Sequence, residues 1–105
     1  MAVSGDITQV PPHKLREWAI AHDQAAEACV TARQDHERTL AAARSWGPLF
    51  HQARRATVDA VNAREAALKH EEQRHRAMAD QLRGGATTME ETEAVRAASL
   101  TIRTD

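Results

Sequence analysis

Histidine is the residue type in this chain that is best suited to metal binding or acid–base chemistry, and six are present among the 105 residues. The nearest approach to a metal site is His70-Glu71 followed by His75, because Glu71 and His75 are four residues apart and share one face of a helix. This spacing is neither the H-E-x-x-H of zinc proteases nor the Glu-x-x-His of helical di-iron sites. We therefore interpret the histidines as locally satisfied side chains, and we expect no metal and no other cofactor.

The other reactive residue types do not form a catalytic pattern either. His22 and His36 are separated by about 21 Å along a helix and cannot bind one ion together. Cys29 is the single cysteine, and no basic residue is placed to activate it, so we interpret it as a small core residue. The sequence contains no nucleophile paired with a base, no phosphate-binding glycine loop and no pair of catalytic carboxylates. We expect that the protein is not an enzyme.

The composition predicts long helices. Alanine, the best helix former, occurs 22 times, whereas aromatic residues make up 3% of the chain and only three prolines and four glycines are present. The predicted fold class is all-α. The net charge of −1 comes from 14 basic and 15 acidic side chains that are well mixed, which argues against binding to nucleic acid or to an anionic membrane surface. No window approaches the roughly 20 apolar residues of a membrane span.

Four residues near the midpoint, Ser45-Trp46-Gly47-Pro48, separate two runs that are almost free of helix breakers. Glycine can adopt the backbone conformation that ends one helix, and proline fits the first turn of the next. We predict a long hairpin of two antiparallel helices, about 12–45 and 48–83, that reverses direction at Trp46-Gly47.

The two ends of the chain are expected to lie outside this hairpin, which spans 11–83. Residues 1–10 predict a flexible tail. They lack the basic start and apolar stretch of a secretory signal peptide, so we expect synthesis in the cytoplasm. Gly84-Gly85 predicts the end of the second helix. Because Thr87-x-x-Glu90 matches a capping box, we predict a short third helix and a C-terminal tail within 84–105.

A seven-residue repeat of small and apolar side chains follows both predicted helices and indicates a coiled-coil-like seam for pairing. Two helices leave one side of each seam open, which favours the pairing of two hairpins into a four-helix bundle. Self-association and a distinct partner are equally open. The seam positions are Leu15, Trp18, His22, Ala25, Cys29, Ala32, His36, Thr39, Ala43 and Trp46, widened by Ala19, Ala26 and Leu40, and then Phe50, Ala53, Ala60, Val61, Ala67, Leu68, His75, Met78 and Leu82.

The two tryptophans are candidates for docking residues, because Trp is common at interface hot spots. By its seam position we interpret Trp18 as core packing instead. For Trp46 both interpretations are open, since a residue at a reversal has less protein to pack against.

A specific set of residues opens the first predicted helix: Val10, Pro12, Leu15, Trp18, Ala19, His22, Asp23, Ala25 and Ala26. At this spacing they resemble the start of EspC-like proteins, which are small helical proteins associated with mycobacterial type VII secretion. That family usually has Leu where Trp18 stands. It then has a long helix, a tight turn of an aromatic residue or His plus Gly, and a second long helix. Trp46-Gly47-Pro48 falls where that turn belongs, and the resemblance covers about Val10 to Val95.

The family also carries an export signal, Tyr-x-x-x-Asp/Glu, after its second helix. At the matching distance from the turn this chain has Met89 and Glu93, so the acid is in place but the Tyr is Met. In related paired substrates one partner can carry the signal for both. The resemblance therefore implies either export with a Tyr-bearing partner or a relative that is not secreted.

The sequence leaves two hypotheses about function. The resemblance implies a non-enzymatic type VII secretion substrate or co-secreted partner that acts by helix–helix pairing, as a homodimer or as a heterodimer with another helical-hairpin protein. Its further partner would be the secretion ATPase or a chaperone of the export machinery, and it would reach the medium or the cell envelope without a signal peptide. The alternative is a cytoplasmic helical adaptor that pairs with another protein and is not exported.

Overall fold

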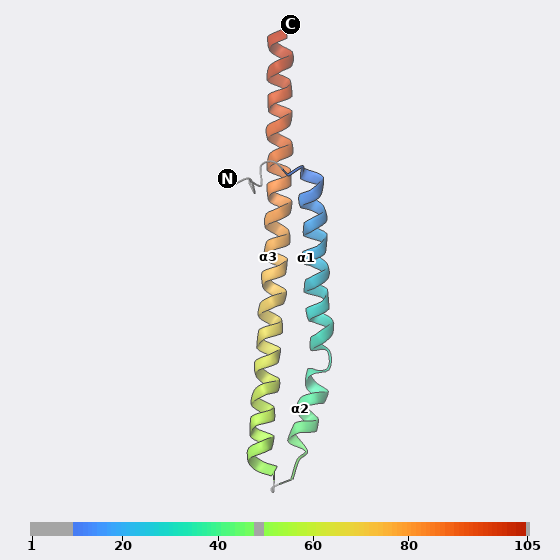
Figure 1. Ribbon diagram of the computed structural model, residues 1–105, viewed down its shortest axis with the longest axis vertical. Coiled ribbons are helices and arrows are strands. Elements are labelled where there is room, and N and C mark those ends of the chain that lie inside the picture. The colour runs from blue at the N-terminus through green and yellow to red at the C-terminus, as the bar shows by residue number, and fades with distance from the viewer. Residues whose placement is uncertain (1–9, 48–49, 105) are drawn as a thin grey trace. The chain divides into compact units, whose positions relative to one another are not determined.

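The computed structural model describes residues 10–47 and 50–104, and within these ranges it contains three α-helices and no strand (Figure 1). They are α1 (Pro12–Arg33), α2 (His36–Arg44) and α3 (His51–Thr104). The prediction of an all-α fold is confirmed. Of the tail expected at 1–10, all but Val10 lies outside the described residues. None of the three helices has a stretch apolar enough to span a bilayer.

The chain forms two compact units, and each contains part of α3. The first unit combines residues up to 23 with residues from 76 onward. The second unit comprises residues 24–75, and therefore includes the second half of α1, all of α2 and the first half of α3.

In the first unit, the start of α1 runs antiparallel to α3. Arg16 contacts Glu90 and Asp23 contacts Arg83, so residue numbers rise along one helix as they fall along the other. The buried residues of this unit are mostly small. They are Leu15 and Ala19 of α1 and Ala79 and Ala86 of α3.

In the second unit, α2 lies beside the first turns of α3 (Figure 1). The pairing is again antiparallel, because Asp35 contacts Arg64 and the backbone carbonyl of Trp46 accepts a hydrogen bond from Arg54. The buried residues here are Ala26, Leu40 and Ala43. The chain therefore reverses between the end of α2 and the start of α3, in a connection whose residues Pro48 and Leu49 lie outside the described part.

Along α1 and α2, half of the predicted seam faces α3 and the other half is displaced by one residue. Leu15 and Ala43 are buried, and His22, Cys29 and His36 are half-buried. In the alternate positions, the buried residues are those that were expected only to widen the seam: Ala19, Ala26 and Leu40. The residues directly before these three were the predicted seam positions. Of them, Ala25 and Thr39 are half-buried and Trp18 is exposed. The contact face therefore lies one residue further along at these positions.

On α3 the predicted seam divides into an inner and an outer row. Val61, Leu68 and Leu82 are half-buried. The alanines that lie seven residues apart are exposed in the single chain, so the contact of α3 with α1 and α2 does not use them. They are Ala53, Ala60 and Ala67.

The predicted break at Gly84-Gly85 is wrong, because α3 continues through both glycines to Thr104. No described glycine has a positive φ, and a helical glycine costs only about 1 kcal/mol relative to alanine. The next residue, Ala86, is fully buried, and Gly85 lies beside Leu15 of α1, so tertiary packing supports the helix at this point. The separate short C-terminal helix is therefore also wrong, and Thr92 donates its hydroxyl hydrogen to the carbonyl of Thr88 inside α3.

The first predicted helix, 12–45, is interrupted where no break was expected. α1 ends at Arg33 and α2 begins at His36, although neither Gln34 nor Asp35 is a strong helix breaker. The sequence had led us to expect a left-handed backbone conformation at Gly47, but this glycine does not have a positive φ. Instead, Ser45 follows the last turn of α2, with its N–H donated to the carbonyl of Ala41 at 3.1 Å and its hydroxyl to that of Ala42 at 2.7 Å.

Candidate functional site

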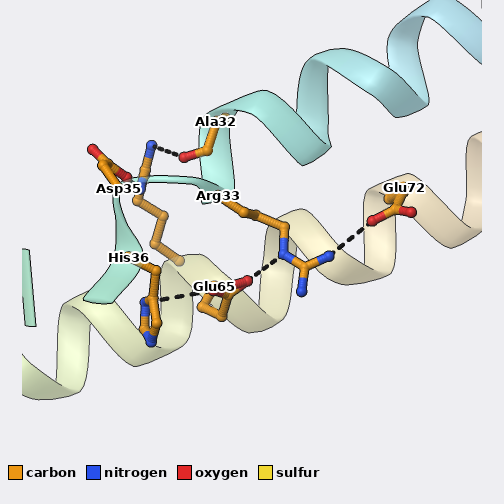
Figure 2. A network of polar contacts seen from close by, with 7 residues as sticks. Ala32, Arg33, Asp35, His36, Glu65 and Glu72 are labelled. Atoms are coloured by element: carbon orange, nitrogen blue, oxygen red, sulfur yellow. Dashed lines mark hydrogen bonds and ion pairs between the residues drawn. The ribbon is translucent and has the colours of Figure 1, made fainter. Parts of the chain in front are cut away.

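A cluster of charged side chains lies in the contact face of the second unit. Arg33, at the end of α1, occupies a position in the heptad pattern where an apolar residue would be usual. Its guanidinium donates through Nε to Glu65 and through Nη1 to Oε1 of Glu72 at 2.8 Å (Figure 2). All three side chains are part-buried. One arginine therefore bridges two carboxylates that are seven residues apart on α3.

The electrostatics of this cluster keep Arg33 charged. The hydrogen bond that Arg33 donates to Glu65 is the largest cause that raises the pKa of its guanidinium above the ordinary value. The charges of Glu65 and Glu72 act in the same direction, and desolvation by burial opposes them. His36, the first residue of α2, places Nδ1 at 3.5 Å from Oε2 of Glu65 (Figure 2). Arg33 thus bonds to both carboxylates in the contact face, an arrangement that holds the end of α1 in register with α3.

Arg64 of α3 contacts the gap between α1 and α2. Its Nη2 donates to the backbone carbonyl of Ala32 at 3.1 Å, and its Nη1 donates to Oδ1 of Asp35 at 3.3 Å. Sequence reasoning missed Arg33, Glu65, Glu72 and Arg64. The first three could have been found as charged residues at heptad positions that are otherwise small or apolar.

The residues predicted for the turn and for recognition lie at the connection between α2 and α3. Trp46 is 40% exposed and Phe50 is 59% exposed, and together with Gly47 they line an open hollow. Arg54 supports this connection, because its Nη1 donates to the Trp46 carbonyl at 3.1 Å and its Nη2 lies 3.2 Å from Nδ1 of His51. The third predicted turn residue, Pro48, lies outside the described residues.

The two residues predicted to form a degenerate export signal, Met89 and Glu93, lie within α3 and not in a separate helix. Met89 is half-buried and Glu93 is exposed, four residues further along. Both line one open hollow, which they share with Thr88, Thr92 and Arg96. From Glu90 to Thr101 every residue is exposed.

The family-like N-terminal motif faces α3 for the most part. Leu15, Ala19 and Ala26 are buried, and Asp23 is held by the guanidinium of Arg83. Trp18 is 44% exposed, so its interpretation as a core residue is wrong. The remaining members are half-buried: Val10, Pro12, His22 and Ala25.

The histidines are spread over both units. His22, His36 and His75 are half-buried, and the described chain contains no group of three or more His, Cys, Asp or Glu side chains that could hold a metal ion. His75 and Glu71, the pair singled out in the sequence, lie 3.9 Å apart between Nε2 and Oε2. Cys29 is a free, half-buried thiol.

Comparison with known proteins gives a family assignment. Residues 4–101 match the family model described as excreted virulence factor EspC, type VII ESX diderm. No curated protein and no solved structure matches the chain. The matched range contains all three helices up to Thr101, the exposed Trp46 connection and the Met89–Glu93 segment. The chain therefore belongs to the EspC family and is a type VII secretion-associated protein.

Proposed function

We propose that this protein acts without catalysis, by pairing with another helical hairpin, as a substrate or co-secreted partner in type VII secretion. The observation that carries the pairing is the imbalance between its buried and exposed apolar side chains. In the described part of the chain, the buried residues larger than alanine are Leu15 and Leu40. The large apolar side chains that are exposed are Trp18, Ile20, Trp46, Phe50, Met78, Val95 and Leu100. Large apolar side chains left open to solvent, with so few buried ones, are candidates for contact with a partner.

The exposed alanine row offers a second argument for pairing. Ala53, Ala60 and Ala67 repeat every seven residues along α3 on a surface that α1 and α2 do not cover. Small residues in such a row let the backbone of another helix come close. A partner hairpin on this row would complete a four-helix bundle, as a homodimer or as a heterodimer.

For export we propose two contact regions that the export machinery reads, through its secretion ATPase or a chaperone. The first is the turn, where Trp46 and Phe50 are exposed and line a hollow with Gly47. The second is the hollow around Met89 and Glu93. Because Met89 replaces the tyrosine of the family signal, this chain would supply the Trp46 region and its partner the tyrosine.

The experiment is purification of the tagged protein from its native host, followed by sedimentation and mass spectrometry. We expect it to purify as a dimer or together with a second helical-hairpin protein, and to be found in the culture filtrate or the cell envelope. An 11.6 kDa species at micromolar concentration with a cooperative melt would contradict pairing. Pairing with strict retention in the cytoplasm would instead identify an adaptor that is not exported.

A further inference from the structure

The gap between α1 and α2 contains no strong helix breaker. Asp35, of a residue type common at N-caps, precedes α2 but makes no side-chain cap hydrogen bond there. Ala32, Arg33 and Gln34 are good helix formers, and neither proline nor glycine occurs near the gap. Interruptions of a helix without such residues arise where a side chain or water enters the backbone hydrogen-bond ladder.

Arg64 is such a side chain. In a continuous helix the Ala32 carbonyl would accept the backbone N–H of His36, four residues later. In the structure this carbonyl accepts a hydrogen bond from Nη2 of Arg64 at 3.1 Å. The second branch of the same guanidinium lies 3.3 Å from the Asp35 carboxylate, inside the gap.

The gap does not change which face of the chain meets α3. Arg33, His36, Leu40 and Ala43 are spaced by three, four and three residues, so the heptad pattern passes through the gap in phase. All four are buried or half-buried. A continuous helix over the same residues would therefore present the same side chains to α3.

The backbone at the gap is also close to helical. Asp35 has φ −92° and ψ 3°, which lies in the bridge region next to the α region. The N–H of Gln34 bonds to the Thr31 carbonyl at 3.1 Å, a tightened last turn of α1. Closure requires a modest rotation at Asp35, and the Ala32 carbonyl exchanges one donor, the Arg64 guanidinium, for another, the His36 N–H.

We propose that the α1–α2 gap is a two-state joint and that Arg64 holds it open. In the open state the Ala32 carbonyl is bonded to Arg64, and in the closed state it is bonded to the His36 N–H, so that α1 and α2 form one helix. The joint sets the direction of α2 and therefore the position of Trp46, which follows α2 by two residues. This inference does not depend on the function proposed above.

The test is amide hydrogen exchange and Cα chemical shifts, measured by NMR on the full chain. The first N–H groups of a helix have no partner within it, so those of His36, Glu37 and Arg38 exchange quickly in the open state. In Arg64→Ala we expect them to exchange about tenfold more slowly, because each gains a backbone acceptor. The Cα shifts of Gln34 and Asp35 should become helical. In Arg64→Lys, which cannot donate to both sites as a fork, the change should have the same direction and a smaller size.

The matched control is Arg74→Ala, which removes an exposed arginine of α3 whose ion pair, with Glu71, lies within the same helix. It should leave all these signals unchanged. Unaltered exchange and non-helical shifts in both Arg64 variants would overturn the proposal, as would equal protection in the control. Global unfolding of both Arg64 variants would also overturn it, since a half-exposed side chain that only holds a joint is not required for folding.

Discussion

Leu15 of α1 and Gly85 of α3 meet so that a Cβ placed on Gly85 would lie 3.9 Å from Cδ1 of Leu15, an ordinary van der Waals distance. At Gly84 an added Cβ would meet nothing within 4 Å. Neither glycine has the left-handed conformation that would require it. Neither the available space nor the backbone conformation therefore requires glycine at position 84 or 85. Each of the two glycines lowers the stability of α3.

The first prediction is that Gly84→Ala stabilises the protein. Alanine is favoured over glycine in a helix interior by about 0.8–1 kcal/mol, and nothing in the structure opposes the added methyl group. The midpoint of thermal unfolding, measured by circular dichroism, should rise by about 4–8 °C. Gly47→Ala is the matched control, because Gly47 also has free space but lies outside the helices. An equal gain at both positions would show that helix propensity is not the cause.

The second prediction concerns the charged cluster. Arg33→Ala leaves the part-buried carboxylates of Glu65 and Glu72 without their shared guanidinium, and should lower the unfolding midpoint more than Arg74→Ala does. Because the folded-state pKa of Arg33 is raised above its ordinary value, the stability that it contributes is fully present below the pKa of the unfolded chain. It is lost only in strongly alkaline solution, as the pH rises through the folded-state pKa. The difference between wild type and Arg33→Ala should therefore be the same at pH 7 and about pH 10. A difference that disappears within this range would refute the role of the arginine charge.

The helices could be predicted from the sequence, but the details of their contacts could not. The abundance of alanine and the heptad spacing predicted an all-α chain, and Leu15 and Ala43 were placed on the contact face. The interruption after Arg33 was missed because it depends on Arg64, which is 31 residues away in the sequence. At Gly84-Gly85 the prediction gave too much weight to helix propensity, which costs about 1 kcal/mol for each glycine and which tertiary context can override.

The candidate site was predictable to a different degree in each part. Trp46 was identified by its place in the predicted turn and Met89 by resemblance to a family. In the structure Trp46 is exposed, and Met89 is half-buried beside an open hollow. Trp18 was placed in the core because its neighbours at heptad spacing are small and apolar. The position alone could not show that Ala19, one residue later, takes the buried place.

The third prediction tests the exposed alanine row. Ala60→Glu should change the stability of the single chain by no more than about 0.5 kcal/mol, because Ala60 is exposed. It should abolish pairing if a second helix packs on the row, since the carboxylate would be buried without a partner. Sedimentation gives the state of assembly, and denaturation of the diluted chain gives its stability. Ala66→Glu is the control, because Ala66 is exposed on a different side of α3. If the Ala60→Glu variant still pairs, the alanine row is not the interface.

The last prediction concerns export. A pocket that accepts the family's tyrosine would be filled poorly by Met89, which has neither ring nor hydroxyl. The group in the pocket that pairs with the tyrosine hydroxyl would be left without a hydrogen bond, which costs about 1–3 kcal/mol, or roughly ten- to hundredfold in recognition. Met89→Tyr should therefore make export independent of the partner. The open hollow beside Met89 leaves room for the ring.

Trp46→Ala should abolish export without unfolding the chain, because Arg54 holds the backbone carbonyl of Trp46 and not its side chain. The controls are Met78→Tyr and Trp18→Ala, which change an exposed methionine of α3 and the other exposed tryptophan. The measurement is the fraction of each variant in the culture filtrate of the native host, with and without the partner gene. Export that survives Trp46→Ala, or that is efficient for the wild type without any partner, would show that the chain does not use a recognition site divided between two proteins.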